Sequence, residues 1–148
     1  MDVFRISQTR YADKLSASGA PNRWNKDNEY VIYTSQSRAL CTLEMVAHRN
    51  ARMKKLDYQL LRISVPSDKK YYLEVEASLP KDWRLLKHYS QLQTIGSDWY
   101  REKKYLILKV PSVLIPGEYN YVINTNHPNF SKVRIASNSP FIWDQRLL

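Results

Sequence analysis

Glu44 stands at a position from which a catalytic carboxylate can face a cleft. After Ser35 and Ser37, either of which can cap a helix, apolar side chains recur at i, i+3 and i+4 spacing, which predicts a helix with one buried stripe. At 100° per residue Glu44 falls one step from the centre of that stripe, at the boundary between buried and solvated positions. Taken alone, the same residue would simply pair with His48 one turn later. The stripe consists of Ala39, Leu40, Leu43, Val46 and Ala47.

Glycines are too few and too scattered to form a phosphate-binding loop. The three glycines of the chain are Gly19, Gly96 and Gly117, so neither a G-x-G-x-x-G motif nor a Walker loop is present. Without such a turn, backbone N–H groups cannot approach the phosphates of a nucleotide. If this chain binds a nucleotide, side chains must hold the phosphates, and arginine is the expected residue type.

The remaining reactive side chains carry no local motif. His48, His88 and His127 are spread along the chain without a neighbouring ligand, so no metal site is expected. Ser112 lacks the G-x-S-x-G elbow of serine hydrolases. Cys41 is the single cysteine, which excludes an internal disulfide and a multi-cysteine zinc site.

Two further residues have ordinary structural interpretations when each is taken alone. Tyr33 is an aromatic residue within a predicted core strand. Arg23 precedes Trp24 and would be a surface cation stacked on an indole ring. Nothing local to either residue connects it to Glu44.

The elements around these residues indicate an α+β domain. Runs of strand composition outnumber helical segments, and several of them are bounded by proline. Residues 80–93 include a short helical segment, followed by a turn at residues 96–99. A basic patch that includes Arg49 and Arg52 follows the first helix and is interpreted as a solvated loop. The predicted strands comprise residues 30–34, 58–65, 71–76, 105–110, 121–124, 132–136 and 141–143.

Length and composition describe one globular domain. With 148 residues, of which 43% are hydrophobic, the chain can bury one core without disulfides or a structural metal. The net charge of +9 predicts an anionic partner: nucleic acid, an acidic protein or a phosphate-bearing small molecule. No apolar run approaches the roughly 18 residues of a membrane span, and no signal peptide is evident. One cysteine agrees with a cytoplasmic location.

Four short segments, taken in order, resemble the RES-domain family, which is named for its Arg, Glu and Ser residues and comprises bacterial toxins of toxin–antitoxin pairs. They contain Arg23, Tyr33, Glu44 and Ser112 in turn. Further segments match in the same order, so the resemblance covers nearly the whole chain, 1–148, as a single RES domain. These segments are the opening strand at residues 3–6, helix positions at 39–40 and 43–44, the turn at 96–99, and the late segments at 115–120 and 124–130.

The chain departs from the family pattern beside the Arg23 segment. Members often carry glycines there, whereas this chain has Pro21 and Asn22 before the segment and Asp27 and Asn28 after it. Asn and Asp tolerate left-handed backbone better than other non-glycine residues, so we expect the turns to be retained.

The resemblance implies an ADP-ribosyltransferase-like fold, with a split or mixed β-sheet and flanking helices, that destroys NAD as its substrate and needs no cofactor. Departure of nicotinamide shifts positive charge onto the ribose, and Glu44 is expected to stabilise that charge or to orient the acceptor. Arg23 and Arg5 would hold the pyrophosphate. By the family pattern, Tyr33 offers nicotinamide its ring face or its hydroxyl, and Ser112 donates to the carboxamide or to a phosphate.

The implied activity is that of an NAD glycohydrolase or phosphorylase, in the toxin of a type II toxin–antitoxin pair. The expected protein partner is an antitoxin with a helix-turn-helix DNA-binding part, and a homodimer within their complex is compatible with the resemblance. Two alternatives stay open. One is an ADP-ribosyltransferase that modifies a protein, and the other is a basic module that binds nucleic acid through its 11 tyrosines and four tryptophans.

Overall fold

A mixed sheet forms the framework of the protein in the computed structural model, which describes residues 1–48, 50 and 53–148. Arg49 and Arg52 of the predicted basic patch lie outside the described residues. Within the described part, seven strands are ordered β4-β5-β6-β2-β1-β3-β7. The elements are β1 (Asp2–Gln8), β2 (Val31–Ser35), α1 (Arg38–Ala47), β3 (Tyr58–Ser64), β4 (Tyr72–Glu74), α2 (Tyr89–Glu102), β5 (Ile107–Pro111), β6 (Tyr119–Asn124) and β7 (Arg134–Phe141).

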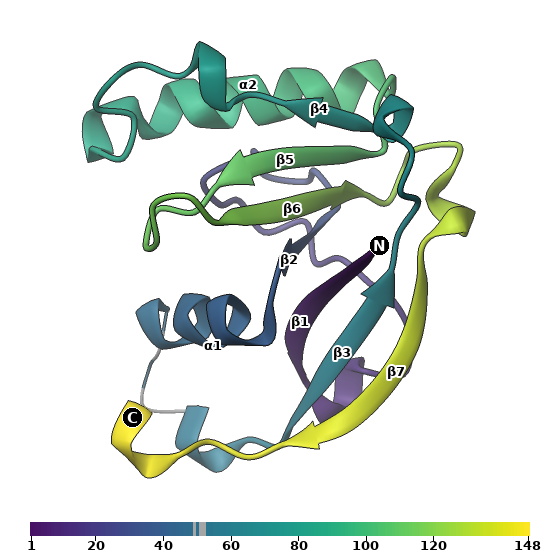
Figure 1. The fold of residues 1–148 in the computed structure, drawn as a ribbon, viewed down its shortest axis with the longest axis vertical. Coiled ribbons are helices and arrows are strands. Elements are labelled where there is room, and N and C mark those ends of the chain that lie inside the picture. Colours follow the sequence, from purple (N-terminus) through teal and green to yellow (C-terminus); the bar gives the residue numbers. More distant parts are fainter. Residues whose placement is uncertain (49, 51–52) are drawn as a thin grey trace.

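The sheet is split between β1 and β2, which meet at one residue pair, Phe4 with Ser35. On one side of the split β4 and β5 run parallel, while the other neighbouring strands throughout the sheet run antiparallel. The two halves diverge, with α2 above the β4-β5-β6 half and α1 between the halves (Figure 1). The prediction of an α+β domain with a mixed sheet and flanking helices is confirmed.

Helix α1 begins as predicted but buries a different face. Ser37 caps it by accepting a hydrogen bond from the Leu40 backbone N–H at 3.1 Å. The fully buried residues of the helix are Leu40 and Cys41, and Cys41 packs with Phe4 of β1. Leu43, predicted inside the stripe, is 39% exposed. The prediction was wrong about the centre of the stripe because α1 packs mainly against β1 and β2, and the residues it buries there are Leu40 and Cys41.

The turn predicted at residues 96–99 is wrong, because these residues lie within α2. Gly96 is needed for the close packing of α2 against the Trp24 backbone and not for a turn. A Cβ built on Gly96 would lie 1.7 Å from the Trp24 carbonyl oxygen, so only glycine lets the helix approach that backbone. The neighbouring Ser97 donates a 2.5 Å hydrogen bond to the buried carboxylate of Glu29. Helix α2 is therefore fixed against the chain segment around Arg23.

The two strands predicted at residues 132–136 and 141–143 are wrong in their bounds, because one strand, β7, runs from Arg134 to Phe141 and contains Pro140. Proline is tolerated there because β7 is an edge strand, whose outer side needs no N–H for pairing. No helix in the described ranges is long and apolar enough to cross a membrane.

Candidate active site

Two uncharged donors from the part of the sheet that contains β5 and β6 hold the Glu44 carboxylate. Asn120 of β6 donates from Nδ2 to Glu44 Oε1 at 2.8 Å, and Ser112, which follows β5, donates from Oγ to the same oxygen at 3.2 Å. His48 does not use the carboxylate, because its Nδ1 donates to the Glu44 main-chain oxygen at 2.9 Å. Glu44 is half-buried, at the boundary position predicted for it.

Arg23 projects from a turn that several hydrogen bonds hold rigid. Asn22 and Asn25 pair across the turn. Gln93 of α2 donates from Nε2 to the carbonyl oxygens of both residues, at 3.0 and 3.1 Å. Asn28 adopts φ 62°, so the left-handed tolerance expected of this segment is used at that position. The turn that carries Arg23 is thus anchored on α2.

The Arg23 guanidinium has an unused donor. Its Nη1 is buried and hydrogen-bonds to no described residue. The guanidinium carbon lies 5.4 Å from the centroid of the Tyr89 ring, within cation–π range. Because a buried N–H without a partner costs free energy, this nitrogen is suited to an acceptor brought by a ligand.

Two cavities meet at Glu44. The Arg5 cavity, of about 320 Å³, is lined by Arg5 and Cys41 among others. The Arg23 cavity, of about 430 Å³, is lined by Arg23 and Tyr89 among others. Both cavities include the shared lining residues Asn22, Tyr33, Glu44, His48 and Asn120. A bound molecule can therefore extend to either side of the carboxylate.

Tyr33 lies between the cavities, but its hydroxyl is already engaged. It donates to Asn25 Oδ1 at 2.6 Å and accepts from the Trp24 backbone N–H at 3.1 Å. Burial is the main cause that raises the pKa of Tyr33, so the phenol stays protonated. Of the two contributions expected of Tyr33, the ring face is the one that is available.

Arg5 fills the split in the sheet. Its Nη1 donates to the main-chain oxygen of Tyr33 at 3.0 Å, which replaces ladder hydrogen bonds where β1 and β2 separate. Burial lowers the pKa of the Arg5 guanidinium, and the nearby Cys41 opposes that shift. Arg5 lines one of the two adjoining cavities and Arg23 lines the other.

Ser112 supports the site from behind. It is fully buried, and besides donating to Glu44 its Oγ accepts from the backbone N–H groups of Leu114 and Ile115 at 3.0 and 3.1 Å. A hydroxyl proton committed to Glu44 is not available to a carboxamide or a phosphate. The geometry thus assigns Ser112 to positioning the carboxylate.

Sequence reasoning missed Asn120 and Tyr89. Asn120 had one signal: it occurs in the late segment 115–120 that resembles the family pattern. Its contact with Glu44 depends on the pairing of β6 with β2, which no local pattern reveals. Tyr89 opens α2, and its distance from Arg23 in sequence gives no hint of their contact.

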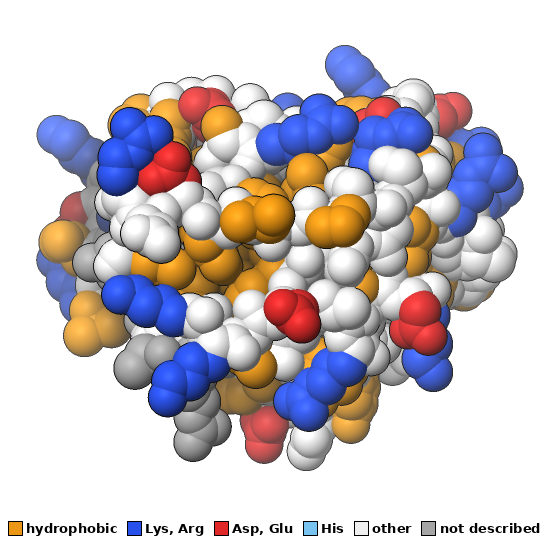
Figure 2. All heavy atoms as spheres, turned by 90° about the horizontal axis from the view of Figure 1, so that it is seen from below, with side chains coloured by type: hydrophobic (Ala, Val, Ile, Leu, Met, Phe, Trp, Pro, Cys, Tyr) orange, Lys and Arg blue, Asp and Glu red, His pale blue; other side chains and the backbone are white. Residues whose placement is uncertain are grey.

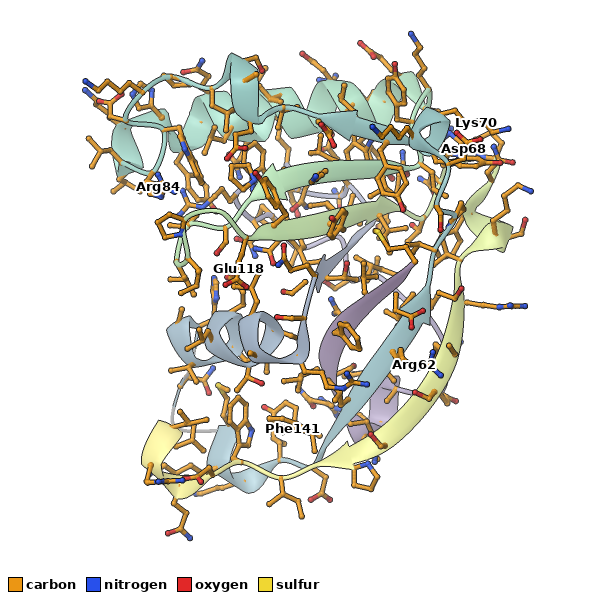
Figure 3. The ribbon with its side chains drawn as sticks, viewed as in Figure 1. Arg62, Asp68, Lys70, Arg84, Glu118 and Phe141 are labelled. Atoms are coloured by element: carbon orange, nitrogen blue, oxygen red, sulfur yellow. The ribbon has the colours of Figure 1, made fainter. Side chains whose placement is uncertain are left out.

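A larger cavity, of about 700 Å³, lies elsewhere and is lined by none of the predicted site residues. It is lined by Tyr58 and Phe141 among others. In Figure 3, Phe141 marks the lower end of β7, whereas Glu118 marks the β5–β6 turn above α1. Among the described residues, no three His, Cys, Asp or Glu side chains are grouped as a metal site.

Comparisons with known proteins agree with this architecture. The family model described as RES domain matches residues 2–144. The chain is 32% identical over 147 residues to the Prs ADP-ribosylating toxin of Sphingobium sp. (strain YBL2), covering 96% of this chain and 91% of that protein. It is 30% identical over 153 residues to Toxin Res of Yersinia enterocolitica serotype O:8 / biotype 1B (strain NCTC 13174 / 8081), covering 99% of each.

A solved structure shares the fold. A chain in the crystal structure of the M. tuberculosis MbcT–MbcA toxin–antitoxin complex superposes with a TM-score of 0.76 at 19% identity, covering 95% of this chain and 83% of that one. The match to the family model extends over almost the full length. Arg23, Tyr33 and Glu44 line the two adjoining cavities, and Ser112 contacts Glu44 from behind them. The chain belongs to the RES domain family.

Proposed function

We propose that this protein cleaves the bond between nicotinamide and ribose in NAD. One observation carries the proposal: Arg23, Tyr33 and Glu44 line the same cavity, although 21 residues separate Arg23 from Glu44. A cation for the pyrophosphate, an aromatic face and an anion for the ribose are thus available to one dinucleotide.

The reaction breaks the C1′–N bond, and its electron pair leaves with nicotinamide, which becomes neutral. Positive charge then lies on the ribose, as in glycoside cleavage. The Glu44 carboxylate stabilises that charge or holds a ribose hydroxyl and orients the acceptor. When the acceptor is water, a C1′–O bond forms, one proton is released and the products are nicotinamide and ADP-ribose; phosphate gives ADP-ribose 1″-phosphate instead.

The two cavities receive the two ends of NAD. We assign the pyrophosphate to Arg23, whose buried Nη1 lacks a partner among the described residues. Nicotinamide then occupies the Arg5 cavity, against the ring of Tyr33. Since Arg5 lines this cavity and not that of Arg23, its remaining N–H groups serve the carboxamide oxygen in preference to the pyrophosphate.

A second candidate function is transfer of ADP-ribose to a protein. It is favoured by the relative in Sphingobium that is named as an ADP-ribosylating toxin. The same carboxylate and the same leaving group serve both reactions, since only the acceptor differs.

The proposed biological setting is a type II toxin–antitoxin pair. Relatives named as toxins and the toxin–antitoxin complex with a similar fold support it. We propose an antitoxin with a helix-turn-helix part as partner, a homodimer within their complex, and action in the cytoplasm, where NAD is present.

The nucleic-acid alternative receives little support from the face of the molecule that includes the underside of Figure 1. In the face shown in Figure 2, Lys and Arg side chains are scattered around apolar patches and form no continuous stripe. A groove that tracks a nucleic-acid backbone needs cations gathered along one path. Salt-dependent binding of DNA or RNA by a protein that leaves NAD intact would reverse this preference.

The experiment is to incubate the purified protein with NAD and measure nicotinamide release, with and without phosphate and with and without a bacterial lysate. Release with buffer alone indicates a hydrolase, release that needs phosphate indicates a phosphorylase, and release that needs lysate protein indicates a transferase. Glu44→Gln should lower the rate by about 10²–10³-fold and keep the fold, because its amide oxygen still accepts from Asn120 and Ser112. Glu102→Gln, an exposed change at the end of α2, is the matched control. Absence of release under every condition would refute the proposal.

A further inference from the structure

Behind Glu44 lies a second hydrogen bond that the proposed reaction does not yet explain. Ser35 Oγ donates to Asn120 Oδ1 at 2.7 Å, and Asn120 Nδ2 donates to Glu44 Oε1 at 2.8 Å. Ser35 is 4% exposed. The three side chains form a chain of hydrogen bonds that begins at Ser35 of β2, on the wall of the Arg5 cavity, and ends at the carboxylate.

The direction of this chain is determined by strand pairing. Ser35 and Asn120 face one another across β2 and β6. A carboxamide presents its oxygen on one side and its NH₂ group on the other. An ionised carboxylate only accepts hydrogen bonds, so Glu44 requires the NH₂ group of Asn120 on its side. The amide oxygen then faces Ser35, whose hydroxyl donates to it and holds the plane of the amide.

The donors that the described part of the chain offers to the Glu44 side chain are both uncharged. Among the described residues, no Lys, Arg or His side chain forms an ion pair with Glu44. Both side-chain hydrogen bonds go to Oε1, and no described residue donates to Oε2. A lysine or arginine partner would fix the carboxylate equally well, but would compensate its charge before substrate arrives. Neutral donors fix its position and leave its negative charge for the ribose.

We propose that Ser35 and Asn120 are positioning residues of the reaction: Ser35 orients the Asn120 amide, and Asn120 holds Glu44 Oε1 so that Oε2 faces the cleft. This inference rests on the proposed function for the identity of the substrate. It adds a requirement beyond the arginine, tyrosine, glutamate and serine of the resemblance, namely an uncharged relay that crosses β2 and β6.

Steady-state kinetics on matched variants test the relay. Ser35→Ala removes the hydroxyl, whereas Ser35→Thr retains one. Asn120→Ala removes the direct donor. We expect kcat for NAD cleavage to fall about 10-fold in Ser35→Ala and about 100-fold in Asn120→Ala, since a misplaced catalytic group costs up to about that much. KM for NAD should change less than kcat, and Ser35→Thr should recover most of the rate.

The control is Thr125→Val, which removes another hydroxyl bond near the same strand pair: Thr125 Oγ1 donates to the Tyr30 carbonyl oxygen at 2.6 Å. Neither Thr125 nor Tyr30 lines the Arg5 cavity or the Arg23 cavity. Thr125→Val should lower the melting temperature and leave kcat unchanged. If Ser35→Ala and Asn120→Ala likewise affect only the melting temperature, the relay is structural and the proposal is wrong.

Crystal structures of the same variants separate this inference from the proposed function. A wild-type protein that leaves NAD intact overturns the proposed function, and the relay is then judged on geometry. A Glu44 carboxylate that has moved or taken several positions in Asn120→Ala supports the relay. A carboxylate that stays in place in that variant overturns it, whatever the activity of the wild type.

Discussion

The hydroxyl of Tyr33 donates a 2.6 Å hydrogen bond to the side-chain oxygen of Asn25 and thereby ties strand β2 to the turn that carries Arg23. The same hydroxyl accepts a hydrogen bond from the Trp24 backbone N–H. It therefore contacts both Trp24 and Asn25, the two residues that follow Arg23. Asn25 is fully buried and donates in turn to three carbonyl oxygens of its own loop. The Tyr33 phenol is therefore the contact through which β2 helps to orient the turn that carries Arg23, alongside the anchors from α2.

Tyr33→Phe tests this dependence. The change keeps the ring but leaves Asn25 Oδ1 and the Trp24 N–H without the partner they have now, at a cost of about 1–3 kcal/mol. We expect a lower free energy of unfolding in urea and a higher KM for NAD. Tyr105→Phe is the control, since the Tyr105 hydroxyl bonds to no described residue. Equal stability and KM in Tyr33→Phe and wild type would show that the turn is held without the phenol.

Arg23→Ala should chiefly weaken binding of NAD. Each charge-assisted hydrogen bond lost costs about 1.5–3 kcal/mol, so we expect Kd to rise at least about 10-fold. Calorimetric titration of NAD into Glu44→Gln and into Glu44→Gln with Arg23→Ala measures this without turnover. Arg101→Ala, which removes an exposed cation of α2, should leave Kd unchanged. An unaltered Kd in the Arg23 variant would remove that residue from the pyrophosphate site.

Gly96→Ala should destabilise the protein, although alanine favours a helix by about 1 kcal/mol. The added Cβ would overlap the Trp24 carbonyl oxygen at 1.7 Å, and overpacking of this kind costs about 1–3 kcal/mol or more. Because Trp24 follows Arg23, NAD binding should weaken as well. Gly117→Ala is the comparison: it has φ 84° and no atom within 4 Å of the added Cβ, so it should cost stability without changing NAD binding. Denaturant midpoints and Kd values check both statements.

Cys41 should make stability fall at high pH. Burial raises the pKa of the Cys41 thiol to about 11, so the folded state keeps a proton that the unfolded chain loses at a lower pH. The stabilisation is complete below the unfolded pKa of about 9 and is lost as pH rises through about 11. It amounts to at most about 3 kcal/mol.

Urea unfolding of wild type and Cys41→Ala at several pH values between 8 and 11 measures this effect. The stability difference between the two proteins should narrow as pH increases. The comparison with Cys41→Ala is needed because burial also raises the pKa of Tyr33 and Tyr58, which titrate in the same direction. A constant difference across the range would contradict the assignment to Cys41.

The position of Glu44 was predictable because helical periodicity is local. Ser37, the spacing of apolar residues and Glu44 all lie within one helix, so the boundary position follows from the 3.6-residue repeat. The buried face was misplaced toward Leu43, since periodicity identifies an apolar stripe but not the element that covers it. The helix α2 was shortened in prediction because Gly96 was interpreted by its usual role in turns.

The partners of Glu44 were less accessible to sequence reasoning. Asn120 reaches Glu44 because β2 pairs with β6 across 85 residues, and such pairings are selected by the whole sheet. Arg5 shows the same limit: its place in the split between β1 and β2 follows from where the ladder stops. The sequence shows only that Arg5 lies two positions after the start of the expected strand at residues 3–6, and this does not reveal where the pairing of β1 with β2 ends.

The hydrogen bonds that fix Glu44 have a consequence for the order in which the site is synthesised. The ribosome adds the carboxylate at residue 44, whereas the two side chains that hold it follow only at residues 112 and 120. The arrangement around Glu44 therefore cannot form until residue 120 of the 148 has been added.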